Sequence, residues 1–245
     1  MLQFFGIGSA FNTKLGNNNA FMKHGDELFM IDCGSTTFSR MISSGILDDV
    51  KKITVLQTHL HADHVGSLGD LVGYAFYCVE PKQTAKVTIL TPKDLTEDIN
   101  EILKKVGITN NQYTSVEIEG EYRPESLMGI TSIKPYKVTH VPHLQCYAYL
   151  MKINGQVMYY SGDSNEIPAD ILEKLKNGSI DLFYQDTSKA DFEGNVHLSL
   201  RKLEELVPVS CRERVYCMHL DEGFSKEEAI GLGFHVVDHI MDKTM

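Results

Sequence analysis

Basic side chains are scarce in this sequence compared with acidic ones. The chain of 245 residues has 23 lysine and arginine residues against 33 aspartate and glutamate residues, a formal net charge of −10 at pH 7. No lysine- or arginine-rich run offsets this total, and an acidic protein repels a nucleic-acid backbone. A nucleic-acid partner is therefore not expected.

Long apolar runs and paired cysteines are also missing. No apolar run approaches the roughly 20 residues that cross a bilayer, and the start, MLQFFGIGSAFN, lacks the basic and apolar segments of a secretory signal. The five cysteines are odd in number and scattered without a C-x-x-C pair, which is typical of reduced, buried thiols. These absences predict a cytoplasmic protein without a membrane partner.

The chain also has no linker rich in proline, glycine or serine and no short repeat, so one domain over residues 1–245 is predicted. Apolar runs bounded by turn residues predict strands within residues 2–8, 20–34, 53–59, 87–92, 132–141, 146–163, 180–186 and 214–219. Amphipathic patterns predict helices over residues 95–107, 168–178 and 199–207. A further helix is expected from Ser225, where Glu228 completes a capping box. The alternation predicts an α/β protein with helices outside its sheets.

Three histidines and an aspartate fall within six residues of the stretch LQTHLHADHVGSLGD. A strand that runs into THLHADH would place His59 and His61 on the same side, because side chains alternate along an extended chain. Asp63 and His64 follow where the chain must turn. A polar surface loop or a single structural zinc is the plainer interpretation, but imidazoles clustered around a carboxylate suit two adjacent divalent cations better.

The H-x-H-x-D-H motif resembles that of the metallo-β-lactamase fold, a four-layer αββα sandwich, and the resemblance covers nearly the whole chain. It implies a dinuclear centre whose remaining ligands follow later strands, in KVTHVPH, YYSGDS and VYCMHLD. The implied ligands of one ion are His59, His61 and His140. Those of the other are Asp63, His64 and His219, with Asp163 between the two ions. His143 is an alternative to His140. The mixed imidazole and carboxylate set suits two Zn²⁺ ions, with Mn²⁺ or iron as alternatives.

Two further stretches resemble the RNase Z branch of this fold. The segment GNVHLSLRKLEEL matches the part of that branch that carries a histidine outside the ligand set, and FYQDTS stands where the branch has an acidic residue. The resemblance implies a phosphodiesterase in which His197 protonates the leaving group and Asp186 steadies it. Without Asp186, His197 could equally be an ordinary residue at a helix start. The candidate catalytic residues are Asp63, His197 and Asp186.

The substrate class follows from what the RNase Z branch has and this chain lacks. RNase Z enzymes carry a basic arm for tRNA and an insertion before the bridging aspartate, whereas here CYAYLMKINGQVMYYSGD passes through a tight Asn-Gly hairpin. The nearest resemblance is to compact phosphodiesterases that hydrolyse 3′,5′-cyclic mononucleotides, such as the anti-Pycsar proteins of phages. It implies a small cyclic-nucleotide substrate, a role in immune evasion, a homodimer and, for a phage-encoded chain, the host cytoplasm. The alternatives are a tRNA 3′ endonuclease, a thioesterase or lactonase, and a non-enzymatic protein that sequesters nucleotides.

Overall fold

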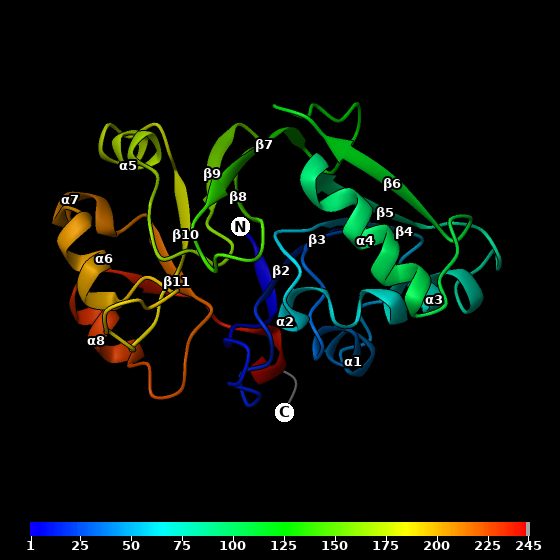
Figure 1. Cartoon of the computed structure of the whole chain (residues 1–245), viewed down its shortest axis with the longest axis horizontal. Helices are drawn as coiled ribbons and strands as arrows, with labels where there is room; N and C mark the ends of the chain where they lie inside the picture. Colours follow the sequence, from blue (N-terminus) through cyan, green and yellow to red (C-terminus); the bar gives the residue numbers. More distant parts are fainter. Residues whose placement is uncertain (244–245) are drawn as a thin grey trace. The chain divides into compact units, whose positions relative to one another are not determined.

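The computed structural model describes residues 1–243, and these divide into two compact units (Figure 1). The first unit consists of Met1–Glu119 with the C-terminal segment from Asp238, and the second unit is Gly120–Val237. Each unit contains one six-stranded sheet with its own helices. The predicted α/β class is therefore confirmed, while the single domain over residues 1–245 stays a prediction.

The sheet of the first unit runs in chain order, and its strands after β2 are parallel. The strands are β1 (Gln3–Gly6), β2 (Asn19–His24), β3 (Glu27–Ile31), β4 (Lys52–Leu56), β5 (Val87–Pro92) and β6 (Tyr113–Ile118). Ile31 at the end of β3 is in register with Leu56 at the end of β4. Because parallel strands end at the same edge of a sheet, the residues that follow β3 and β4 emerge side by side.

Helices of the first unit cover one face of this sheet. They are α1 (Thr37–Ser43), α2 (Ala62–Val65), α3 (Leu68–Tyr77) and α4 (Lys93–Lys105), and the 3₁₀ helix η1 (Ile240–Lys243) contacts β1. Alternate residues of β3 and β4, such as Met30 and Val55, share one buried cluster with Leu71 of α3 and Leu103 of α4. Helix α4 ends as predicted, with the Ile108 N–H donating to the Leu103 carbonyl over 2.9 Å.

The second unit has the sheet order β12-β11-β10-β9-β8-β7. The strands are β7 (Ile130–Val138), β8 (Cys146–Ile153), β9 (Gln156–Tyr160), β10 (Leu182–Asp186), β11 (Val215–Met218) and β12 (His235–Val236). Strands β7 to β9 are antiparallel and β9 to β12 are parallel. Asn154 and Gly155 both have positive φ between β8 and β9, which confirms the predicted tight hairpin.

The helices of the second unit are α5 (Ala169–Lys176), α6 (Leu200–Leu206), α7 (Val209–Arg212) and α8 (Lys226–Gly231). Ser225 caps α8 as predicted, because its Oγ accepts the Glu228 N–H over 3.1 Å. Ser199 caps α6 in the same way through the Lys202 N–H. Within residues 1–243, no helix combines the length and the apolar character that a membrane crossing requires.

Candidate metal centre and acid–base pair

The histidine-rich stretch of the first unit lies just beyond the end of β4. The strand predicted to run through His59 is wrong at its end, because β4 stops at Leu56 and a loop leads from there into α2. The side chain of Gln57 is buried in this loop, where its Nε2 donates to Asp32 Oδ1 over 2.9 Å and to the His59 carbonyl over 2.7 Å. The same Nε2 lies 3.1 Å from the His64 carbonyl. The side chain of Gln57 thus fixes both ends of the motif.

Asp32, which follows β3, organises this loop from the neighbouring strand. Its Oδ1 accepts the Thr58 N–H over 2.7 Å, and its Oδ2 accepts the Thr58 hydroxyl over 2.7 Å and lies 2.7 Å from Nδ1 of His64. The residue is fully buried and has a φ of 66°, a strained backbone for a residue other than glycine. Burial raises the pKa of Asp32, and the nearby His64 offsets part of that rise. The sequence analysis missed this residue, although an acidic residue directly after an apolar strand was a usable signal.

The four motif residues of the first unit come together as predicted. Nε2 of His59 lies 3.1 Å from Nδ1 of His61, and the rings of His59 and His64 are 4.0 Å apart between centroids. Asp63 Oδ2 is 3.3 Å from Nε2 of His64. A Cβ at Gly34 would collide with the carbonyl oxygen of Asp63, so only glycine lets the motif pack this closely against the chain after β3.

In the second unit, three predicted ligands meet although they follow three different strands. His140 comes two residues after β7, Asp163 follows β9, and His219 directly follows β11 with a φ of 58°. Asp163 Oδ2 lies 3.3 Å from Nε2 of His219 and 3.8 Å from Nε2 of His140. Burial lowers the pKa of His140, and Asp163 offsets part of this decrease. His143 is exposed, whereas His140 is buried and lies close to Asp163.

Asp186, the last residue of β10, joins two histidines. Its Oδ2 lies 2.7 Å from Nδ1 of His197 and accepts the Ser164 N–H over 3.0 Å, while its Oδ1 lies 3.3 Å from Nδ1 of His219. Burial alone would raise the pKa of Asp186, but the two histidines outweigh it and lower that pKa. For His197 the effects have the opposite sign. Burial by itself would lower its pKa, but the Asp186 carboxylate has the larger effect and raises that pKa. The predicted pairing of His197 with Asp186 therefore exists in the structure.

Five histidines of the two units share one feature: a protein oxygen lies beside Nδ1 of the ring. These pairs are His59 with Thr58 Oγ1, His64 with Asp32, His140 with the Val196 carbonyl, and both His197 and His219 with Asp186. Such a contact fixes the tautomer and orientation of a histidine that ligates a metal through its other nitrogen. The imidazole and carboxylate donors in each unit therefore fit divalent ions of the zinc and manganese type.

The two sheets and their helices define a protein of the metallo-β-lactamase fold. The solved structure of a new diphosphatase from the PhnP family superposes with a TM-score of 0.75 at 17% sequence identity. The match covers 97% of this chain and 94% of that chain, which confirms the predicted αββα fold class.

The particular family follows from the sequence comparisons. The family model described as "Anti-Pycsar protein Apyc1" matches residues 1–237, and the chain belongs to this family. An anti-Pycsar protein Apyc1 from Paenibacillus harenae is 28% identical over 226 residues, covering 89% of this chain and 88% of that protein. The protein of the same name from Bacillus phage BSP38 is 28% identical over 235 residues, with the same two coverages.

Proposed function

We propose that this chain is a dinuclear metal-dependent phosphodiesterase that hydrolyses 3′,5′-cyclic mononucleotides. The observation that carries the proposal is the position of Asp186, whose two oxygens contact a predicted metal ligand, His219, and a histidine outside the ligand set, His197. A proton donor held beside a metal ligand is what cleavage of a phosphodiester with a poor leaving group requires. Membership of the anti-Pycsar Apyc1 family supports the cyclic substrate.

The proposed ligands are those that the resemblance implies. One ion would take His59, His61 and His140, and the other Asp63, His64 and His219, with Asp163 shared. Two divalent ions bound there would neutralise phosphate charge and lower the pKa of the attacking water. Zinc is the proposed metal because of the imidazole-rich donor set, with manganese as the alternative.

His197 would supply the proton for the departing alkoxide. The Asp186 carboxylate accepts the Nδ1 proton of His197 over 2.7 Å, so Nε2 is the nitrogen left to face a substrate. The Asp186 carboxylate beside Nδ1 raises the pKa of His197, which favours the protonated imidazole that a proton donor needs. These properties suit a general acid whose proton leaves from Nε2.

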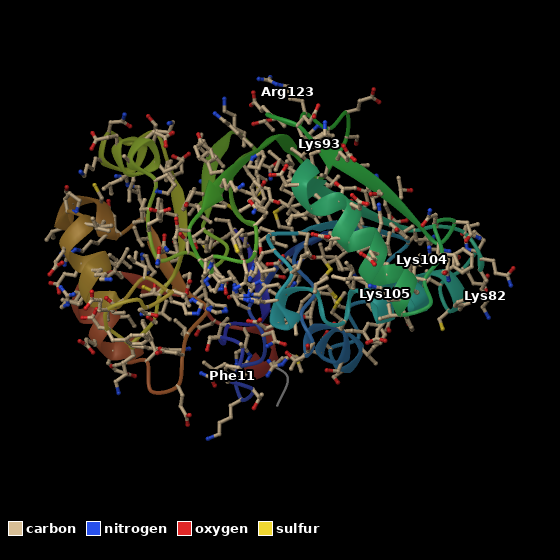
Figure 2. All side chains as sticks on the ribbon, viewed as in Figure 1. Phe11, Lys82, Lys93, Lys104, Lys105 and Arg123 are labelled. Atoms are coloured by element: carbon tan, nitrogen blue, oxygen red, sulfur yellow. The ribbon has the colours of Figure 1, made fainter. Side chains whose placement is uncertain are left out.

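The surface supports a small substrate over a tRNA. The net charge is −10, and the exposed cations labelled in Figure 2 include several that pair with carboxylates. Lys105 lies 2.7 Å from Glu101, Arg123 lies 2.8 Å from Glu121, and Lys93 pairs with Glu119. The neighbouring carboxylates reduce the local positive charge that a phosphate backbone would meet. The hairpin between β8 and β9 turns through Asn154 and Gly155 alone, without the insertion of the RNase Z branch.

A turnover screen tests this function. Protein with its metal content measured by elemental analysis is offered cyclic mononucleotides, a precursor tRNA, a thioester and a lactone. We expect about two ions per chain and hydrolysis of cyclic mononucleotides to linear monophosphates far faster than any other reaction. Efficient tRNA 3′ cleavage would establish the endonuclease instead, and tight retention of the nucleotide without turnover would establish a sequestering protein. The homodimer and the cytoplasmic location stay predictions.

A further inference from the structure

The loop that carries His197 is closed on itself between β10 and α6. The Ser188 N–H donates to the Leu198 carbonyl over 2.9 Å, and the Leu200 N–H donates back to the Ser188 carbonyl over 2.9 Å. Residues 189–197 therefore leave the sheet and return to the point where they left it. His197 lies next to this closure, so its position depends on how the returning end of the loop is held.

Asn195 holds the returning end. Its side chain is buried, and its Nδ2 donates to Ser188 Oγ over 3.1 Å and to the Ala190 carbonyl over 2.7 Å. Its Oδ1 accepts the backbone N–H of His197 over 3.2 Å. The backbone carbonyl of Asn195 accepts a further bond of 3.2 Å from Nδ2 of Asn165. One side chain thus ties the start of the loop to the histidine near its end.

We propose that Asn195 is a positioning residue, which sets the orientation of the His197 imidazole against Asp186 and so the efficiency of proton donation. The proposal rests on the proposed function of His197. The site requires two N–H donors and one acceptor on a short side chain, and among the natural side chains of this length only asparagine offers them. An aspartate at this position would keep an acceptor for the His197 N–H. Its second carboxylate oxygen, however, has no proton to donate to the Ala190 carbonyl.

The same short segment also touches a predicted metal ligand. The carbonyl of Val196, between Asn195 and His197, accepts the Nδ1 proton of His140 over 3.0 Å. A shift of the segment could therefore weaken metal binding as well as proton donation. For this reason the kinetics are measured with saturating metal, and the decisive readout is the dependence on the leaving group.

The test compares two substrates in an Asn195→Ala variant. A cyclic mononucleotide releases an alkoxide that needs a proton, whereas bis(p-nitrophenyl) phosphate releases a phenolate that does not. We expect kcat for the cyclic mononucleotide to fall about 10- to 100-fold, the scale of a small misplacement of a catalytic group, with little change in KM. The rate with bis(p-nitrophenyl) phosphate should change by no more than about twofold, the size of a neutral substitution.

Asp191 of the same loop provides the matched control. Its carboxylate accepts the Ser199 hydroxyl over 2.8 Å and pairs with Arg201 over 2.5 Å, and these bonds do not involve His197. Asp191→Ala should loosen the loop yet change both rates by about twofold at most. Asn195→Ser is the second variant if Asn195→Ala does not fold, with the same expected outcomes.

A double variant separates positioning from a general structural role. If Asn195 acts through His197, adding Asn195→Ala to His197→Ala should cause no further loss with the cyclic mononucleotide, since coupled residues are not additive. A further tenfold loss, or an equal loss with both substrates in the single variant, would overturn the proposal. If His197→Ala shows no leaving-group dependence, the proposed function fails instead. The positioning role is then read from a crystal structure of Asn195→Ala, in which an intact bond between His197 Nδ1 and Asp186 Oδ2 would refute it.

Discussion

The two units hold their histidines with two buried carboxylates that behave in opposite ways. Asp32 of the first unit contacts one histidine, His64, and burial raises its pKa. Asp186 of the second unit contacts two, His197 and His219, which together outweigh burial and lower its pKa. Under the proposed function, Asp32 would orient a predicted ligand, whereas Asp186 would also favour the protonated form of His197.

The units differ as well in how they bring their predicted ligands together. In the first unit, the four predicted ligands fall between His59 and His64 on one loop and the start of α2. In the second unit, His140, Asp163 and His219 each follow a different strand, and the returning end of the 189–197 loop adds His197. A local motif therefore defines the first cluster, and the register of a sheet defines the second.

The largest effect is expected when the proposed proton donor of the second unit, His197, is removed. His197→Ala should slow hydrolysis of a cyclic mononucleotide about 10²- to 10⁴-fold, because the alkoxide then leaves without a proton. Bis(p-nitrophenyl) phosphate should be cleaved at nearly the normal rate, and elemental analysis should find the metals retained. An equal loss with both substrates and intact metal content would mean that His197 binds the phosphate instead.

The next effect distinguishes the two histidines of the stretch HVPH. His140→Ala should lower metal content and reduce turnover by more than about 100-fold. Loss of a residue that only hydrogen-bonds to a metal ligand costs about 10- to 100-fold in metal affinity or activity, so loss of the ligand itself should cost more. His143→Ala should leave both nearly unchanged, since His143 is exposed while His140 is buried beside Asp163. Titration of the apoproteins with Zn²⁺ measures the difference. The reverse pattern would make His143 the ligand.

A smaller effect tests the contrast between the two carboxylates directly. Asp32→Asn and Asp186→Asn should each weaken metal affinity by about 10- to 100-fold, because each holds Nδ1 of a predicted ligand. Under saturating metal, Asp186→Asn should keep a defect with the cyclic mononucleotide but not with bis(p-nitrophenyl) phosphate, since His197 loses its partner. Asp32→Asn should show no such selectivity between the two substrates. The same selectivity in Asp32→Asn would show that the two carboxylates do not differ in function.

The smallest effect concerns the thiols. Burial raises the pKa of Cys33 in the first unit and of Cys217 in the second to about 12. Cys78 of the first unit is exposed, whereas Cys146 and Cys211 are buried. Iodoacetamide at pH 8 should therefore modify one thiol per folded chain rapidly, without loss of activity, as read by mass spectrometry. Rapid modification of Cys217 would indicate that the second unit opens in solution.

Some helices and strands were not predicted from the sequence, and for two of them the structure gives the reason. Helix α3 (Leu68–Tyr77) contains Gly69 and Gly73, which lower its helix propensity. Strand β6 (Tyr113–Ile118) is exposed over most of its middle, so it has no regular alternation of apolar and polar residues. Helix α4 with its strong apolar periodicity and helix α8 with its Ser225 cap were predicted and are present.

The sequence by itself determined the α/β class, the H-x-H-x-D-H cluster and the residue types that suit divalent metals, because these depend on local spacing and side-chain chemistry. The tertiary structure decided which groups meet across long separations. Asp32 reaches His64 over 32 positions, and His140 reaches the Val196 carbonyl over 56. It also distinguished the buried His140 from the exposed His143, and it assigned Asn195 its contacts with His197. Such contacts follow from strand order and register, which bring distant strand ends to one edge of a sheet, and no local pattern encodes them.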